Sequence, residues 1–153
     1  MGSLALPASA KDSLGVYSSW AAFRDPGAPR CYAIAKPSSA TTRRDYSPYA
    51  SVASWPARSI RNQFHIRLSR ELATNARIRL AIGSKRFNLT GGGGDAWAKD
   101  AAMDAAIIAA MRSATQMSVR ARDKSGRAFT DRYQLAGAAT AIDAALLGCA
   151  ELR

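Results

Sequence analysis

Arginine is the residue of this chain whose placement most clearly points to chemistry. Segments that alternate apolar and polar residues place arginines on the polar side of two strands and of a later hairpin, at Arg67, Arg77, Arg79, Arg120, Arg122, Arg127 and Arg132. Guanidinium groups bind phosphates and carboxylates through paired hydrogen bonds. If the two sets share one face of a sheet, we expect a basic stripe that binds anions or a partner protein.

Net charge supports this hypothesis and also offers a simpler alternative. The chain carries 22 Lys and Arg against 11 Asp and Glu, a formal charge of +11. Such a field raises the local concentration of nucleic acid, anionic lipid head groups or lipopolysaccharide. Arginine is far more frequent than lysine, however, and alanine is abundant, as the codon bias of a GC-rich genome would produce. The basic face is then either functional or a solvated surface that matters only for solubility.

Catalytic groups are sparse. A hydrolase needs a nucleophile, a base and an orienting group, and the only histidine is His65. It falls on the polar side of its strand beside Arg67, so we interpret it as exposed decoration. The chain lacks a Gly-x-Ser-x-Gly elbow, a Cys-x-x-Cys pair and a His/Cys cluster with zinc-ligand spacing. We therefore expect no enzymatic activity, no metal and no cofactor.

Two further features, a possible pair of catalytic carboxylates and a possible phosphate-binding loop, have structural explanations. Asp100 and Asp104 fall on one side of an expected helix, where the first serves as the N-cap and the second favours the positive end of the helix dipole. The glycine run at 91–94 is not followed by Gly-Lys-Ser/Thr, so we interpret it as a flexible connection and not as a phosphate-binding loop.

The start of the chain is typical of an export signal. Residues 4–10 combine apolar residues, a proline and then small residues of the kind that signal peptidase recognises. We interpret residues 1–10 as a signal-peptide remnant and residues 11–153 as one domain; a flexible alanine-rich terminus is the alternative. No stretch of about 18 apolar residues could span a membrane as a helix. Export predicts a periplasmic or secreted protein and argues against nucleic acid as its partner.

The two cysteines, Cys31 and Cys149, are an even set. In an oxidising compartment outside the cytoplasm we expect them to form a disulfide. Such a bond would tie an early strand to the last helix. Two buried free thiols, which would act as small core residues, are the alternative.

Alternation and a high content of β-branched and aromatic residues predict a chain made mostly of strands. We expect strands at 16–23, 30–35, 49–55, 63–69, 77–82 and 86–89, a polar loop at 36–48, a two-residue turn at Gly83-Ser84, a helix at 100–113, a hairpin at 117–135 and a short final helix after Gly137. Many strands without strand–helix–strand alternation indicate an antiparallel sandwich or a partly closed barrel, capped by one or two helices.

With these elements in order, several segments resemble one family. The matching residues are Trp20, Arg30-Cys31-Tyr32-Ala33, the stretch 104–119, Tyr133-Gln134-Leu135-Ala136-Gly137, Ala141-Ile142 and Cys149. The chain thus resembles the invasion-associated locus B family of alphaproteobacterial envelope proteins. The resemblance implies a secreted or periplasmic, mainly β, antiparallel immunoglobulin-like β-sandwich without established enzymatic activity or cofactor, in a family named for a role in host-cell invasion. The low cysteine number and the loop at 36–48 depart from the family pattern.

Two hypotheses for function follow. The first is an exported, non-catalytic binding protein that recognises an anionic envelope component or an envelope protein. The second is a structural accessory subunit of a larger envelope assembly. A subunit would carry an apolar contact patch, to which Trp55 or Trp97 could contribute, whereas a polyanion binder would depend on salt-sensitive arginines.

Overall fold

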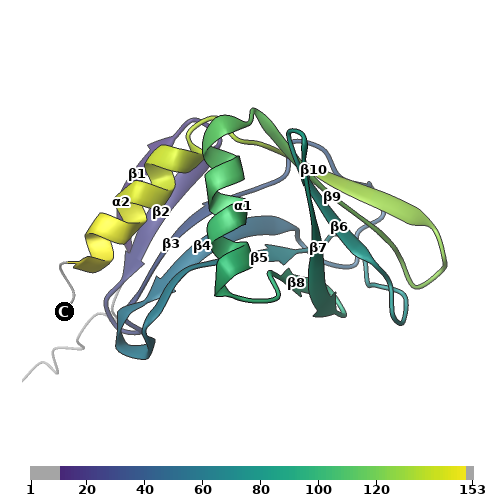
Figure 1. The fold of residues 1–153 in the computed structure, drawn as a ribbon, viewed down its shortest axis with the longest axis horizontal. Helices are drawn as coiled ribbons and strands as arrows, with labels where there is room; N and C mark the ends of the chain where they lie inside the picture. Colours follow the sequence, from purple (N-terminus) through teal and green to yellow (C-terminus); the bar gives the residue numbers. More distant parts are fainter. Residues whose placement is uncertain (1–10, 151–153) are drawn as a thin grey trace, which may run out of the picture.

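A computed structural model describes residues 11–150 of the chain. These residues form ten antiparallel strands, two α-helices and one short 3-10 helix, η1 (Pro56–Arg58) (Figure 1). The elements are β1 (Asp12–Tyr17), β2 (Trp20–Asp25), β3 (Arg30–Ala35), β4 (Tyr49–Trp55), β5 (Ile60–Arg67), β6 (Ile78–Ile82), β7 (Lys85–Gly92), β8 (Asp95–Trp97), α1 (Ala101–Ser113), β9 (Gln116–Arg122), β10 (Ala128–Gln134) and α2 (Ala138–Ala150). The expected signal-peptide remnant at 1–10 lies outside the described residues.

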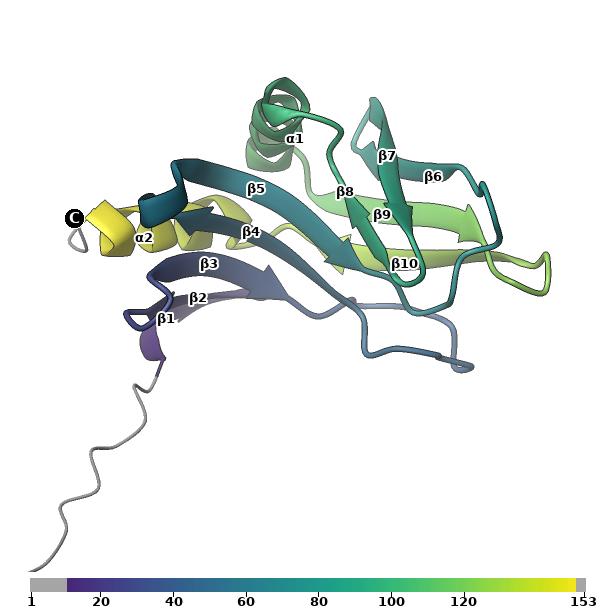
Figure 2. The same ribbon diagram turned by 90° about the horizontal axis from the view of Figure 1, so that it is seen from below.

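All the strands belong to one curled sheet of order β1-β2-β3-β4-β5-β8-β7-β6-β9-β10. Strand β7 joins its two halves: Lys85 to Leu89 pair with β6, whereas Thr90 to Gly92 pair with β8. Figure 2 shows the sheet curling as a half-barrel. The prediction of a mainly β, antiparallel fold with helices is confirmed. The immunoglobulin-like sandwich is not, because the strands pair continuously and do not separate into two facing sheets.

The loop after β3 is bonded to β10, at one end of the sheet. The backbone N–H of Ser38 donates to the carbonyl of Arg132 at 2.8 Å, and the N–H of Arg132 donates to the carbonyl of Ser39 at 2.8 Å. Strand β10 is the last strand of the sheet, so these bonds occupy part of an edge that would otherwise be open. The expected polar loop is therefore a structural tie between distant parts of the curl.

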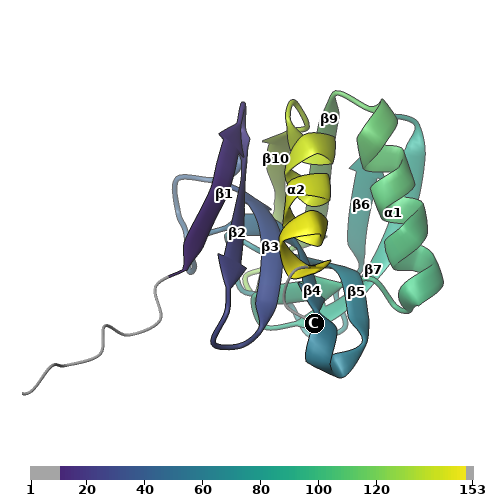
Figure 3. The same ribbon diagram turned by 90° about the vertical axis from the view of Figure 1, so that its left-hand side faces the viewer.

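The core lies on the inner side of the curl. Alternate residues of β5 and β6 point inward and are buried, as the sequence pattern predicted: Phe64, Ile66, Leu68, Ile78, Leu80 and Ile82. Helix α1 packs against β5, β6 and β7, and α2 packs against β1 to β4. Both α-helices lie on the same side of the sheet (Figure 3), so neither α-helix of residues 11–150 covers its outer face.

Helix α1 begins as predicted, but one of its carboxylates has an additional role. Asp100 is the N-cap, and its Oδ1 accepts from the N–H of Met103 at 2.8 Å. Asp104 Oδ1 accepts from the backbone N–H of Phe64 in β5 at 2.9 Å. Burial raises the pKa of Asp104, while the hydrogen bond from Phe64 opposes the rise. Asp104 therefore ties the helix to the sheet and does more than favour the helix dipole.

Two turns differ from the prediction. The single strand expected at 16–23 is a hairpin, in which Ser18 adopts a φ of 55° and separates β1 from β2. The glycine run at 91–94 is not a flexible link, because it forms the end of β7 and the turn into β8. A Cβ on Gly91 would overlap the carbonyl oxygen of Asp95, so this close strand approach requires glycine.

The predicted disulfide is confirmed. Cys31 in β3 and Cys149 in α2 are bonded, across a sequence separation of 118 residues. Both cysteines are buried in the core. The bond holds the last helix against the strands that it covers.

We expect the Cys31→Ala/Cys149→Ala variant to lose about 4 to 5 kcal/mol of unfolding free energy, because the bond restricts a long loop in the unfolded chain. Urea denaturation of the oxidised wild type and of the variant measures the difference. Wild type held reduced by a thiol reductant should lose a similar amount. A difference below about 1 kcal/mol would contradict the expected constraint on the unfolded chain.

Candidate anion-binding groove

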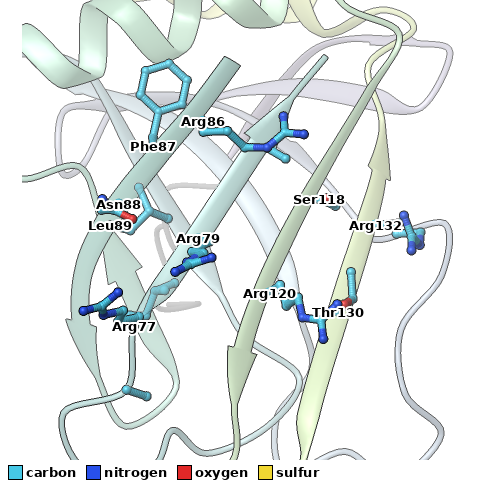
Figure 4. Close-up of a pocket in the computed structure, with 13 residues that line it drawn as sticks. Arg77, Arg79, Arg86, Phe87, Asn88, Leu89, Ser118, Arg120, Thr130 and Arg132 are labelled. Carbon is cyan, nitrogen blue, oxygen red and sulfur yellow. The ribbon is translucent and has the colours of Figure 1, made fainter. Parts of the chain in front are cut away.

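A groove of about 910 Å³ crosses the outer face of β6, β7, β9 and β10. It is lined by Ala76, Arg77, Ile78, Arg79, Ala81, Arg86, Phe87, Asn88, Leu89, Ser118, Arg120, Thr130 and Arg132. We call it the arginine groove. Its arginines come from four neighbouring strands, or the approach to them, and lie around one hollow (Figure 4). None of its lining residues is acidic.

Strand register places like charges directly beside one another in this groove. Arg79 of β6 is the cross-strand partner of Arg120 of β9. Like charges at directly opposed positions destabilise a sheet. Within residues 11–150, neither side chain has an ion-pair or hydrogen-bond partner, and the same holds for Arg77 and Arg132. An anion bound between the strands would relieve this repulsion.

Small side chains form the floor of the groove beside this pair. Ala81 of β6 lies opposite both Arg86 and Ser118, and Ser118 lies opposite Arg132. These four residues form one cross-strand row. Arg86 and Arg132 are exposed at its two ends, and the short side chains of Ala81 and Ser118 lie between them. This geometry leaves room for a ligand between arginines and not merely above them.

Arg86 is the groove residue that sequence reasoning missed. Its Nη1 donates to the carbonyl of Gly83 at 3.0 Å, which holds the side chain beside the hairpin turn. The predicted two-residue turn at Gly83-Ser84 would have been sufficient to find it, because that turn fixes Arg86 opposite Ala81.

The structure gathers part of the predicted stripe. Arg77, Arg79, Arg120 and Arg132 line the arginine groove. Arg122 lines an adjoining hollow with three of them, and its Nη1 also donates to the carbonyl of Gly126 at 2.9 Å. Arg127 lies apart, in a hollow that it shares with Arg43 and Arg70. Arg67 is on β5, outside all three hollows.

Arg67 belongs to a cluster in which its charge is neutralised. Its Nη1 lies 2.7 Å from Asp95 Oδ2, and its guanidinium group lies 4.0 Å from the ring centre of Tyr46. His65 Nε2 lies 2.9 Å from the other oxygen of Asp95, and the imidazole stacks on Trp97 at 5.1 Å. Arg67 therefore has a local partner that the groove arginines lack.

His65 is not the exposed decoration that the sequence suggested, since its side chain is only 18% exposed. Its position between Asp95 and Trp97 raises the question of a catalytic histidine. Ser51 is its cross-strand partner on β4 but is buried, and no hydrogen bond joins the two side chains among the described residues. Ser51 is therefore not an accessible nucleophile for His65.

Asp123 fixes the hairpin that carries much of the groove. Its Oδ1 accepts from the N–H and hydroxyl of Ser125 and from the N–H of Arg127, and its Oδ2 accepts from Arg70. The hydrogen bond from the Ser125 hydroxyl is the main cause that lowers the pKa of Asp123 to about 2, with contributions from Arg127 and Arg70. The ionised carboxylate therefore holds the β9–β10 turn together.

Residues 11–150 contain no group of three or more His, Cys, Asp or Glu side chains arranged to hold a metal ion. In the same part of the chain, no helix has the length and apolar character needed to cross a membrane.

The curled antiparallel sheet with two helices on its inner side defines a mainly β fold that is also found in a solved structure. That structure is invasion associated protein B from Bartonella henselae, with a TM-score of 0.61 and 14% identity over 87% of this chain and 95% of that chain. The comparison shows a fold shared with a protein of the kind that the sequence resembles, although this fold is a curled sheet and not the expected sandwich. No protein-family model and no curated protein matches the chain.

The lowered pKa of Asp123 predicts a pH dependence of stability. Because the folded-state pKa of about 2 lies below the ordinary value of about 3.9, this carboxylate contributes stability above roughly pH 4 that is lost as the pH falls toward 2. Urea midpoints of the wild type and Asp123→Asn should converge across this window. A constant difference between pH 5 and pH 2.5 would assign the effect of the substitution to lost packing and not to ionisation.

Proposed function

We propose that this chain is an exported, non-catalytic binding protein of the bacterial envelope, and that the arginine groove recognises anionic groups. The observation that carries the proposal is the direct opposition of Arg79 and Arg120 in a hollow without acidic residues. A surface that served solubility alone would gain nothing from placing two unpaired arginines at facing positions. A phosphate or carboxylate between them makes charge-assisted hydrogen bonds to both.

Two observations support export. The bond between Cys31 and Cys149 belongs to a class that persists in oxidising compartments such as the periplasm. The fold is shared with invasion associated protein B. Together with the signal-like residues 1–10, they support a periplasmic or secreted protein. An envelope phosphate or carboxylate is then the anion that the groove would meet, and nucleic acid is not.

The groove also differs from a single-stranded nucleic-acid site. Such sites combine basic strands with exposed aromatic rings on which bases stack. Phe87 is the aromatic residue that lines the groove, and it packs against the core. Recognition here therefore depends on charge and hydrogen bonding, without a stacking platform.

A structural accessory subunit is the second candidate. Trp97 is 39% exposed, on a sheet face that no helix covers. An apolar contact through this residue would survive high salt, whereas anion binding by the arginine groove would not.

We expect inorganic polyphosphate to bind at low ionic strength, with an affinity that falls steeply between about 50 and 200 mM salt. Arg79→Gln/Arg120→Gln should weaken binding by about tenfold or more, since charge-assisted hydrogen bonds are lost. Arg58→Gln/Arg61→Gln removes the same charge outside the groove and is the matched control. Titration calorimetry measures both variants. Equal losses would show that net charge, and not the groove, binds the polymer.

Export predicts a processed and oxidised protein in the native host. The intact mass of the purified chain should correspond to an amino terminus near residue 11, and neither cysteine should react with an alkylating reagent before reduction. Mass spectrometry with and without reduction tests both points. An unprocessed chain with two reactive thiols would contradict export.

A further inference from the structure

A mainly apolar hollow of about 600 Å³ lies on the outer face of the sheet, and its lining reaches β10, which also lines the arginine groove. We call it the apolar hollow. Its lining includes Val16, Ala21, Ile34, Pro37 and Pro48. None of its lining residues is acidic, and Lys36 is among them. The hollow was not anticipated from the sequence, because its residues come from segments far apart along the chain.

Strand register builds the floor of this hollow. Val16 of β1 lies opposite Ala21 of β2, which lies opposite Ile34 of β3. The three side chains form one row on the outer face, where no helix covers them. Val16 is 74% exposed, so its apolar side chain is accessible to a ligand. The row therefore offers apolar surface to a ligand.

Strand β10 contributes to the lining of both hollows. Arg132 lines the arginine groove and Gln134 lines the apolar hollow. They are two residues apart on the same side of one strand, which separates them by about 7 Å. Ser38 bridges them, because its N–H and hydroxyl donate to the Arg132 carbonyl and its hydroxyl oxygen lies 3.5 Å from the Gln134 amide nitrogen. A ligand of modest size can therefore contact both.

We infer that the ligand of this surface is an anionic amphiphile: a phosphorylated lipid whose phosphate binds in the arginine groove and whose acyl chain lies in the apolar hollow. The inference rests on the proposed anion-binding function and names its ligand class. Charge complementarity selects the phosphate, because neither hollow contains an acidic side chain. The exposed apolar row of the apolar hollow favours a hydrocarbon chain, because moving methylene groups of the chain out of water favours binding.

Dioctanoyl phosphatidic acid, used below its micelle concentration, tests the inference against glycerol 3-phosphate, which carries a phosphate without acyl chains. Titration calorimetry should give about tenfold or more tighter binding of the lipid, the ratio expected when roughly two methylene groups leave water. Dioctanoyl phosphatidylcholine, which has the same chains and no net charge, should bind about tenfold or more weakly than the phosphatidic acid.

Val16→Ser should remove most of the acyl-dependent gain and leave glycerol 3-phosphate binding unchanged. Because Val16 is mostly exposed, the variant should fold. Leu147→Ser changes an apolar residue that is 69% exposed on α2, outside the hollow, and is the control. Ala21→Glu, which places a carboxylate in the hollow, should weaken lipid binding further.

The outcomes separate this inference from the proposed function. Equal affinity for glycerol 3-phosphate and dioctanoyl phosphatidic acid, both lost in Arg79→Gln/Arg120→Gln, would overturn the acyl site and leave anion binding intact. Absence of binding to both compounds and to polyphosphate would overturn the proposed function itself. Equal binding of the phosphatidylcholine and the phosphatidic acid would overturn the role of the arginine groove in lipid recognition.

Discussion

The pairing of β7 with two different neighbours is the constraint on which the rest of the structure depends. Because the strand bonds to β6 along one half and to β8 along the other, ten strands remain a single sheet. Close approach at Gly91 makes the second pairing possible. A continuous sheet has one inner face, which takes both helices and the core, and one outer face. The arginine groove and the apolar hollow share that outer face and can act together.

The distribution of carboxylates explains why the outer face stays positive. Asp104 bonds to the backbone of β5, Asp131 accepts from the backbone and hydroxyl of Ser69 inside the curl, and Asp123 holds the β9–β10 turn. Asp95 neutralises Arg67. Each of these acids serves a structural bond away from the arginine groove. Among residues 11–150, the arginines of the groove therefore have no acidic partner.

Sequence patterns predicted those parts of the structure that depend on neighbouring residues. Alternation identified β4 and β6, and the N-cap rule identified Asp100, because each signal is local. The turn at Ser18 was missed because it contains no Gly, Pro or Asn. The predicted arginine stripe was only partly correct. Strand order and register across the whole sheet decide that Arg132, and not Arg67, lies in the same groove as Arg79. The curl itself depends on the same long-range pairing, which a linear pattern does not contain.

The bonds between the loop after β3 and Arg132 also limit how copies of this protein could associate. Growth of a fibre by strand addition requires two open edges, one on each side of every molecule. The edge of β10 is occupied at its centre by Ser38 and Ser39, which leaves β1 as the other terminal strand of the sheet. Contact through β1 alone joins a molecule to a second one and stops there. The loop bonds thus hinder repeated strand addition, because they occupy part of the β10 edge.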